Sequence, residues 1–404
     1  MPQSIVAAGG YGGFEQASRP LGGSAVVFCR TDFSGGDRRA AFIMKNRQSA
    51  SWREVLAGIA DKADAVDSHS LWPQSSLRRL KQAGAMRWAV ERRFGGTGMA
   101  AMALHRRYEQ VAACCLTTAL AWTQRDAAVG LLQSCPATSA IGTVLQTLAQ
   151  GRSWATIGIS QLTTSTQHQH QPAVVAARTA AGWTLDGRIP WVTGANESRW
   201  IVVGTKTTNR QELLVLLPTS HKGVTPGRPP PMAALNGSKT CAVRLKGVEV
   251  RPSLVLLGPC AHVLAARDAV RRFSLTTCVL PLGVAAGAIS ASRLVLSGRS
   301  AQCRRSVATL RNEYKHLARC VYRRGSGGKL PSSEAAALRA KANLLAFRSS
   351  LMCLELSKGR GFVMGNAAQR RVREAMFCCV WSSNAHVIEE TVRQLALAAP
   401  DAVP

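Results

Sequence analysis

The chain is poor in acidic residues and lacks several patterns that identify whole classes of protein. It has 22 Asp and Glu against 51 Lys and Arg, which gives a formal net charge of +29. None of its 12 cysteines forms the C-x-x-C pair typical of zinc and thioredoxin-like sites. The first 38 residues lack a basic start followed by an apolar core, so no signal peptide is evident. No uninterrupted apolar run approaches the roughly 20 residues of a membrane span, and we expect a reduced, soluble, cytoplasmic protein.

The excess of positive charge raises the question of a nucleic-acid or other polyanionic partner. The arginines are scattered, however, and the densest groups are only Arg304-Arg305, Arg323-Arg324 and Arg370 to Arg373. Scattered charge favours a solvated basic surface, so nucleic acid is not expected and a polyanion-binding scaffold stays a minor alternative. His168 and His170 have no nearby Cys or acidic residue, so they indicate a polar loop and we predict no metal site.

The residue pattern changes twice along the chain and predicts an α+β protein. Residues 1–43 are Gly-rich and aperiodic, so we interpret them as a disordered or mis-called extension, with Met44 as the first residue of the folded protein. Residues 44–152 read as an N-terminal α-helical domain. It includes a Ser51–Glu54 capping box and helical spacing over Leu71 to Ala85 and Ala100 to Leu132.

Residues 153–260 read as a middle β domain, a barrel or sandwich of short β-branched segments separated by Gly, Pro, Asn and Asp. Residues 261–404 return to helical spacing, with breaks at 325–333 and 359–366, and predict a C-terminal four-helix bundle. The strands are expected at Thr156 to Leu162, Ala173 to Thr179, Trp183 to Leu185, Trp200 to Lys206, Glu212 to Leu217, Thr240 to Leu245 and Val248 to Leu257.

The segment DGRIPWVTGANESRWIVV, residues 186–203, contains Asp186-Gly187, a strong signal for a two-residue hairpin turn. Trp191 and Thr193 then fall where a strand ends in a polar corner. By themselves they read as a core tryptophan and an exposed threonine. A second interpretation depends on the rest of the chain.

From about Ser51 onward the chain resembles the acyl-CoA dehydrogenase superfamily. The α, β, α order fits, and several motifs follow in the family's order at its spacing, although no single one is decisive. They are RFGGTG (93–98) for a Gly-rich turn, GISQLTTST (158–166) for a Thr-Glu-Pro-x-x-Gly-Ser loop, GWTLDGRIPWVTGA (182–195) for Gly-x-Lys-x-Trp-Ile-Thr-Asn, GSKTCAVRLKGVEVRP (237–252) for the closing strand, and GRGFVMGNAAQRRVREA (359–375) for Phe-Gly-Gly-x-Gly…Arg-Asp-Ala.

This resemblance implies an FAD-dependent oxidoreductase that acts on CH–CH groups, by α,β-dehydrogenation of an acyl thioester. The family's Trp packs on the flavin ring and its Thr hydroxyl bonds near N5, which would be the roles of Trp191 and Thr193. Arg299 or Arg304 would supply the charge that reaches the flavin pyrophosphate, although the Phe-Gly that follows it in the family is absent. The residues expected to bind the cofactor are Ile159, Ser160, Thr166, Trp191, Thr193, Gly359, Gly361 and Asn384.

The carboxylate that removes the α-proton in this family is missing from both positions where members carry it. At the Tyr-Glu-Gly-Thr motif this chain has Trp381 to Asn384, so Ser382 stands at the base position, and a serine needs an activating partner to act as a base. At the earlier position it has Thr276-Thr277. Glu374 is expected to pair with a neighbouring Arg, and Glu389 with Glu390 to form an exposed pair on the terminal helix.

Three explanations stay open: a base displaced to Glu389 or Glu390, a different chemistry, or a degenerate flavin-binding protein. The different chemistry would be that of relatives in which reduced flavin and oxygen hydroxylate a substrate without an α-proton base. The resemblance also implies a homodimer or homotetramer, an acyl-CoA or related small-molecule substrate whose phosphates arginines attract, and an electron-transfer flavoprotein or flavin reductase as redox partner.

Overall fold

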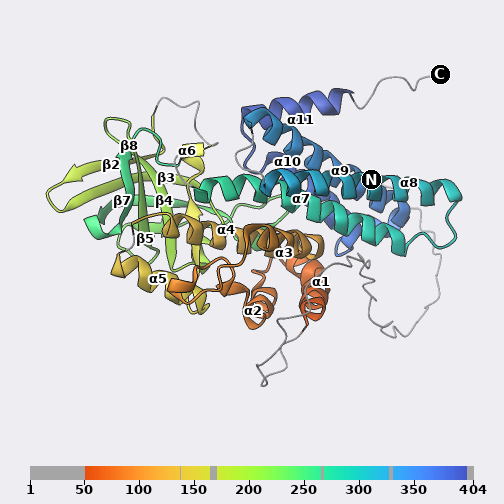
Figure 1. Cartoon of the computed structure of the whole chain (residues 1–404), viewed down its shortest axis with the longest axis horizontal. Helices are drawn as coiled ribbons and strands as arrows, with labels where there is room; N and C mark the ends of the chain where they lie inside the picture. The colour runs from red at the N-terminus through yellow and green to blue at the C-terminus, as the bar shows by residue number, and fades with distance from the viewer. Residues whose placement is uncertain (1–50, 137, 164–170, 265–267, 327–330, 398–404) are drawn as a thin grey trace, which may run out of the picture. The chain divides into compact units, whose positions relative to one another are not determined.

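The computed structural model describes residues 51–136, 138–163, 171–264, 268–326 and 331–397, and within them the chain runs from helices to a sheet and back to helices (Figure 1). This order confirms the α+β prediction. The predicted extension at 1–43, Thr166 and the His168–His170 pair lie outside the described residues.

The N-terminal part is helical, and its first helix begins as predicted. The Ser51 hydroxyl accepts from Glu54 N at 3.3 Å while the Glu54 carboxylate accepts from Ser51 N at 2.7 Å, which completes the capping box. The predicted stretch from Ala100 to Leu132 is divided in two, because Cys115 has an extended backbone. The elements are α1 (Trp52–Ser68), α2 (Gln74–Gln82), η1 (Ala85–Arg87), η2 (Arg92–Phe94), α3 (Ala101–Cys114), α4 (Leu116–Gln133) and α5 (Ser139–Ala149).

The middle part forms one eight-stranded sheet in the order β6-β7-β3-β2-β4-β5-β8, with β1 parallel to β4. The segment predicted as one strand from Thr156 to Leu162 is a short strand followed by a helical turn, α6 (Ser160–Thr163). Strands were predicted at Thr240 to Leu245 and at Val248 to Leu257. In the structure, residues 241–250 form one continuous strand, and a separate strand begins at Val255. The strands are β1 (Ala155–Gly158), β2 (Val174–Thr179), β3 (Gly182–Val192), β4 (Trp200–Thr207), β5 (Glu212–Pro218), β6 (Val224–Pro226), β7 (Cys241–Val250) and β8 (Val255–Cys260).

The hairpin predicted at Asp186-Gly187 is wrong: β3 runs straight through these residues. They form a bulge, where the register against β7 shifts between Leu185 and Gly187. A glycine is needed there because its φ is 136° and a Cβ would lie 2.2 Å from the Ala173 carbonyl oxygen. The turn between β2 and β3 instead joins Thr179 to Gly182.

Both faces of the central strands are buried, which explains why they read as apolar runs. In β4, Val202 faces a core formed with α4 and α5, while Ile201 and Val203 face a second core formed between the strands. In β5, Leu214 and Leu213 divide between the same two cores. The alternation of side chains along each strand therefore holds the sheet against α4 and α5 on one side (Figure 1).

The C-terminal part has one more helix than the predicted bundle of four. The break expected at 359–366 is present, and a further link at residues 381–384 starts a short terminal helix. The first four of these helices share one core with α1 to α4, which includes Ile59, Leu116, Leu282 and Leu345. They are α7 (Asp268–Leu294), α8 (Ala301–Ser326), α9 (Ser332–Gly361), α10 (Ala367–Val380) and α11 (Ala385–Leu397).

Among the described residues, one helical stretch, Thr276–Leu294 in α7, is long and apolar enough to cross a membrane. Our sequence expectation of no such stretch overlooked it because Thr, Gly and Ser interrupt its apolar residues. Of this stretch, 67% is buried within the protein, as in the core helix of a folded domain.

Candidate functional site

The end of β3 and the segment after β1 converge on one another. A Cβ on Gly158, the last residue of β1, would lie 3.0 Å from Ile189 and 3.3 Å from Val192 of β3, so the glycine permits this close approach. The Thr156 hydroxyl donates to the Thr193 carbonyl at 2.8 Å. The two segments that the sequence singled out for cofactor contact therefore lie side by side.

Trp191 is not a core residue and Thr193 is not exposed, contrary to what the two residues by themselves suggested. Trp191 is 51% exposed, whereas Thr193 is 9% exposed. The Thr193 hydroxyl lies 3.0 Å from the Thr240 hydroxyl, which in turn lies 2.7 Å from the Ser238 hydroxyl. A hydroxyl can donate once and accept twice, so Thr193 retains hydrogen-bonding capacity beyond this chain. A large indole exposed beside a fixed hydroxyl is suited to contact a planar ligand.

Ser160 and Ile159 lie at the start of α6, against the same edge of the sheet. The Ser160 hydroxyl oxygen is buried and has no hydrogen-bond partner among the described residues. Next to it, Gln161 donates through Nε2 to the Gly158 carbonyl at 3.0 Å, which holds the β1–α6 corner in place. Leaving a buried hydroxyl unpaired costs about 1–3 kcal/mol, so its position calls for a ligand or water.

The sequence analysis missed a pair of aromatic residues beside this site. A Cβ on Gly194 would lie 2.6 Å from the indole of Trp72, and Trp72 meets Trp154 edge to face at 6.1 Å. Gly194 has a φ of 61°, so the chain turns sharply directly after Thr193. The Gly in the WVTGA segment was the available signal, because a conformation with positive φ permits a bulky neighbour to approach.

Ser382 and Asn384 form a second group, in the link between α10 and α11. Ser382 is exposed and adopts a φ of 52°, while the Asn384 side chain accepts from Val387 N at 3.0 Å and so caps α11. Buried Arg339 donates to the Cys378 carbonyl at 2.7 Å and to the Trp381 carbonyl at 3.1 Å. Its guanidinium also stacks 5.4 Å from the Trp381 ring. These contacts hold the link by capping, and among the described residues none of them gives Ser382 an activating partner.

Burial of this link shifts the ionisation of the groups around Arg339. Desolvation lowers the pKa of Arg339, and the neighbouring Cys378, Cys278 and Cys379 act in the opposite direction. Desolvation also raises the pKa of the Cys378 thiol to about 12, even though Arg339 lowers it. Cys378 is therefore a neutral thiol at pH 7 and packs as a small apolar residue.

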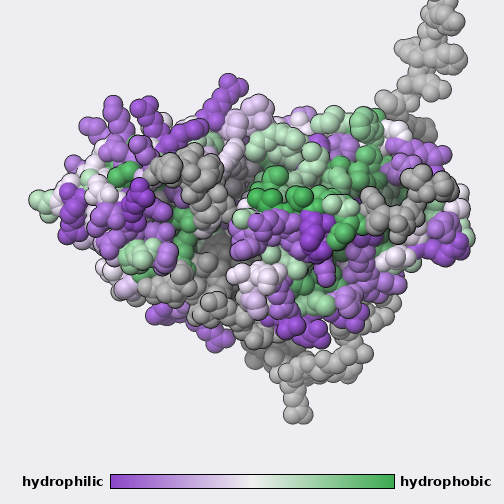
Figure 2. Space-filling view, turned by 90° about the horizontal axis from the view of Figure 1, so that it is seen from above, coloured by the Kyte–Doolittle hydropathy of each residue, from purple (hydrophilic) through white to green (hydrophobic). Residues whose placement is uncertain are grey.

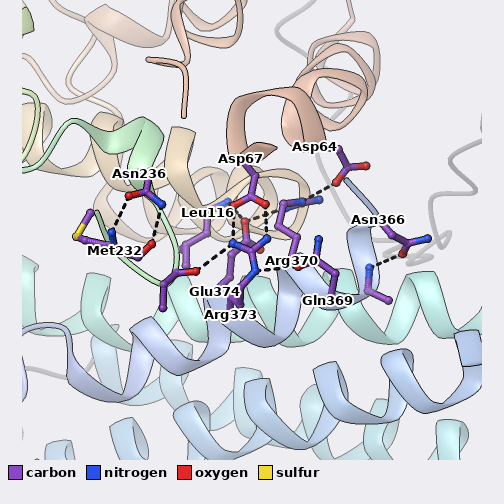
Figure 3. A network of polar contacts seen from close by, with 12 residues as sticks. Asp64, Asp67, Leu116, Met232, Asn236, Asn366, Gln369, Arg370, Arg373 and Glu374 are labelled. Atoms are coloured by element: carbon purple, nitrogen blue, oxygen red, sulfur yellow. Dashed lines mark hydrogen bonds and ion pairs between the residues drawn. The ribbon is translucent and has the colours of Figure 1, made fainter. Parts of the chain in front are cut away.

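Glu374 is held in a polar network that ties α10 to α1 and α4 (Figure 3). Its carboxylate pairs with Arg370 at 2.8 Å and accepts from Leu116 N at 3.3 Å, which caps α4. Arg370 also pairs with Asp64 at 2.8 Å. The prediction that Glu374 pairs with a neighbouring Arg is confirmed, and the carboxylate is engaged in holding helices together.

The other carboxylates considered for a base are on the surface of α11. The Glu389 side chain is 75% exposed, so the predicted exposed position is confirmed for this residue. Glu390 is bonded to Arg393 at 2.7 Å, and the pKa of Glu390 is lowered to about 2 by Arg393 and Gln394. At the family's earlier base position, Thr276 is buried in α7.

Gly359 and Gly361 lie at the end of α9, where a non-helical Lys358 bends the chain. A Cβ on Gly359 would meet nothing within 4 Å, whereas one on Gly361 would lie 2.5 Å from Ser357. Gly361 is therefore required by packing within the helical region. Arg299, expected near a pyrophosphate, donates to the Leu356 carbonyl in this same region.

No family model and no curated protein matches this sequence. Solved structures do match its fold. A glutaryl-coenzyme A dehydrogenase in complex with glutaryl-CoA is 14% identical, with a TM-score of 0.76 over 85% of this chain and 94% of that chain. The dibenzothiophene monooxygenase TdsC from Paenibacillus sp. A11-2 is 12% identical, with a TM-score of 0.71 over 86% and 96%. A nitrososynthase from Micromonospora carbonacea var. africana is 19% identical, with a TM-score of 0.69 over 86% and 95%.

Proposed function

We propose that this chain, which has the acyl-CoA dehydrogenase fold, is a flavin-dependent oxidoreductase with its ring site at the end of β3. The observation that carries the proposal is the half-exposed indole of Trp191 on β3, which packs against Gly158, together with the Ser160 hydroxyl two residues after Gly158, buried and without a partner among the described residues. Structures of the same fold include a dehydrogenase of an acyl-CoA and a monooxygenase, which are compatible with this reading. A flavin held there would supply the hydride-transfer and oxygen chemistry that side chains lack.

The residues at the end of β3 fit a flat, polar-edged cofactor. Trp191 offers an aromatic face, Ser160 a hydroxyl with unused hydrogen-bonding capacity, and Thr193 a hydroxyl fixed by Thr240. Ile159 adds apolar contact beside Ser160. Asn384, by contrast, is committed to capping α11, so its assignment to the cofactor receives no support from its contacts.

We propose FAD as the flavin, on the family resemblance. TdsC, which shares the fold, has been solved in complex with FMN and indole, so the two flavins need to be compared directly. Purified protein should be titrated with each flavin while the quenching of flavin fluorescence is followed. A Kd for FAD at least tenfold below that for FMN supports the assignment, and the reverse order replaces FAD with FMN.

Of the reactions open to this fold, we propose an oxygen-dependent monooxygenation in preference to α,β-dehydrogenation of an acyl thioester. The support comes from Ser382, which is exposed and is held in a capped link without a carboxylate neighbour among its described contacts. Dehydrogenation needs a base placed at the α-proton. Glu374 is buried in its pair with Arg370, and Glu390 is paired with Arg393 on the surface.

One experiment separates the two reactions. The flavin-loaded protein is first mixed with acyl-CoA thioesters of several lengths without oxygen, and bleaching of the visible flavin bands is recorded. It is then supplied with a flavin reductase, NADH and oxygen, and substrate-dependent product formation is measured by mass spectrometry. Bleaching by a thioester would establish dehydrogenation and contradict the monooxygenase proposal. Failure to bind any flavin would overturn the oxidoreductase proposal itself and direct attention to polyanion binding.

Ser382→Glu provides a matched test of the missing base. If the link retains the family geometry, this variant places a carboxylate at the base position and thioester-dependent bleaching increases. The left-handed backbone at Ser382 already costs any residue with a Cβ about 1–2 kcal/mol, so folding of the variant is checked by thermal unfolding. Ser382→Gln, which has the same size without the charge, is the control and should not increase bleaching.

We also propose that the chain forms a homodimer or homotetramer through the face that carries α11. Apolar side chains gather among the helices on this face (Figure 2), and three of them recur on α11 at helical spacing. Light scattering on the purified protein measures the mass, and Val392→Glu should shift it toward the monomer. The exposed apolar residues on α10 and α11 include Met376, Val380, Ile388, Val392 and Leu395.

A further inference from the structure

Helix α8 carries a strongly positive surface that the proposed function does not use. Its residues include six arginines and one lysine against one acidic residue, Glu313. Glu313 is paired with Arg348 of α9 at 2.9 Å, and Arg324 in the last turn of α8 is paired with Glu334 of α9 at 2.9 Å. After Glu313, α8 itself contributes no carboxylate beside its remaining basic residues. This part of the helix therefore has an electrostatic environment that attracts anions.

A hollow of about 310 Å³ lies on this positive surface and is lined by His316, Arg319, Cys320 and Arg323. These residues are spaced by three and four positions, so one face of α8 presents all four side chains. The volume is at the lower end of the range for small-molecule sites, about 300–1,000 Å³. The hollow is thus large enough for a small ligand and combines a nucleophile, a base and two cations.

The nucleophile and the base are already in contact. The Cys320 sulfur lies 3.6 Å from His316 Nε2, at the distance of a sulfur hydrogen bond. Cys320 is partly exposed, unlike Cys114 and Cys378, which are buried. A thiol that donates to an imidazole can transfer its proton and become the reactive thiolate.

The two arginines flank this pair on the same face. Arg319 donates through Nε to the Lys315 carbonyl at 3.2 Å, which holds its stem along the helix. Arg323 follows Arg319 by one turn. Guanidinium groups bind carboxylates through paired hydrogen bonds, so a carboxylate-bearing molecule is the anion that suits this hollow.

We propose that the hollow is a site of thiol–disulfide exchange with a small, carboxylate-bearing disulfide. His316 takes the Cys320 proton, the thiolate attacks one sulfur of the disulfide, and a Cys320–sulfur bond forms as the disulfide bond breaks. The other half leaves as a thiolate with the electron pair of the broken bond, so Cys320 ends as a mixed disulfide and the number of disulfide bonds is unchanged. Arg319 and Arg323 hold the carboxylates. This site is separate from that of the proposed oxidoreductase function.

The test compares two disulfides on the full-length protein. One is 5,5′-dithiobis(2-nitrobenzoate), which carries two carboxylates, and the other is neutral 2,2′-dithiodipyridine. Short reactions are quenched with acid and the labelled peptides are mapped by mass spectrometry. The expected result is that the dicarboxylate labels Cys320 at least about tenfold faster than Cys303 or exposed Cys260, and that Cys320→Ser removes the fast phase. Cys303 lies on the same helix and contacts Ser300.

Charge variants test the role of the arginines. Arg319→Ala with Arg323→Ala should slow the dicarboxylate at Cys320 by about three- to tenfold and leave the neutral reagent unchanged. Arg304→Ala with Arg305→Ala removes the same charge elsewhere on α8 and should change neither rate by more than about twofold. His316→Gln should slow both reagents by about tenfold. Equal labelling of Cys303 and Cys320, or an equal effect of the two arginine pairs, would overturn the proposal.

Discussion

The end of β3 and the α10–α11 link were both expected to form the reaction site, but their polar groups are used differently. At the end of β3, the Ser160 hydroxyl is buried without a partner among the described residues, and half of Trp191 is exposed. In the link, Asn384 caps α11 and Arg339 caps the end of α10. The first region has binding capacity left over, while the second uses its polar groups to maintain its own conformation.

This difference shows where a divergent sequence retains the features of a ligand site. A residue that matches a family motif can be engaged in a local hydrogen bond instead, as the side-chain oxygen of Asn384 is. A buried polar group without a hydrogen-bond partner destabilises the protein, because it has lost its bonds to water, and a ligand that bonds to it removes this cost. We therefore rank the β3 end above the link as the place where the cofactor binds. Substitutions of Trp191, Ser160 and Ser382 test this ranking, and a substitution of Glu374 tests the helix network beside the link.

Glu374→Ala should have the largest effect of these substitutions, and the effect should be on the stability of the fold. It leaves buried Arg370 with only Asp64 and removes the cap on Leu116 N, so we expect a loss of about 3–5 kcal/mol in the free energy of unfolding. Urea denaturation measures this loss. Glu313→Ala, which breaks an exposed pair with Arg348, should cost less than about 1 kcal/mol. Equal losses would show that the α10 network is not a buried structural tie.

Trp191→Ala should have the largest effect on the cofactor. Loss of the aromatic face should raise the Kd for flavin by about 10- to 100-fold without changing the free energy of unfolding of the apoprotein, because the indole is half exposed. Fluorescence titration gives the Kd. Phe362→Ala, which removes a 76% exposed ring elsewhere, is the control. If both variants bind flavin as the unmodified chain does, the ring site is not at the end of β3.

Ser160→Ala should have a smaller effect on the same measurement. Removing one hydrogen bond to the ligand should weaken flavin binding by about three- to tenfold. Because the buried hydroxyl is unpaired without a ligand, the same substitution should leave the apoprotein equally stable or slightly more stable. A fall in apoprotein stability would mean that Ser160 has a structural partner instead of a ligand.

Ser382→Ala should change flavin affinity and turnover by less than about twofold. The side chain is exposed and the link is held by Arg339 and Asn384, so the Ser382 hydroxyl takes no part in the proposed chemistry. Steady-state kinetics with the substrate identified by mass spectrometry provides the check. A loss of turnover greater than about 100-fold, with the flavin still bound, would instead place Ser382 in the reaction.

The order of helices and strands could be predicted from the sequence because periodicity changes sharply at its boundaries. The Ser51–Glu54 capping box is local, and it forms as predicted. The prediction of a hairpin at Asp186-Gly187 failed because the glycine permits close contact with Ala173, directly before the neighbouring strand. No local sequence pattern shows this contact. The prediction of unbroken helical spacing from Ala100 to Leu132 failed for the same reason, since distant Glu374 caps the helix that begins after Cys115.

For the candidate site, the sequence indicated which residues to consider, but it did not show the exposure or the hydrogen bonding of their side chains. The family resemblance selected Trp191 and Ser160, yet only the fold shows that the indole is exposed and the hydroxyl unpaired. Asn384 and Gly361 were selected on the same grounds, and packing and capping account for both. The contacts of Trp72 with Gly194 join segments more than a hundred residues apart, which explains why the sequence analysis missed them.

The hydrogen bond from Leu116 to Glu374 spans 258 positions of the chain, and the pairs of Asp64 with Arg370 and Asp67 with Arg373 span 306. During synthesis the N-terminal helices leave the ribosome long before the helix that completes them exists. Until then their apolar faces have no permanent cover, because α1 to α4 share their core with the C-terminal helices. The nascent chain therefore keeps apolar helix faces uncovered until α10 is made, which is the condition that favours aggregation during folding.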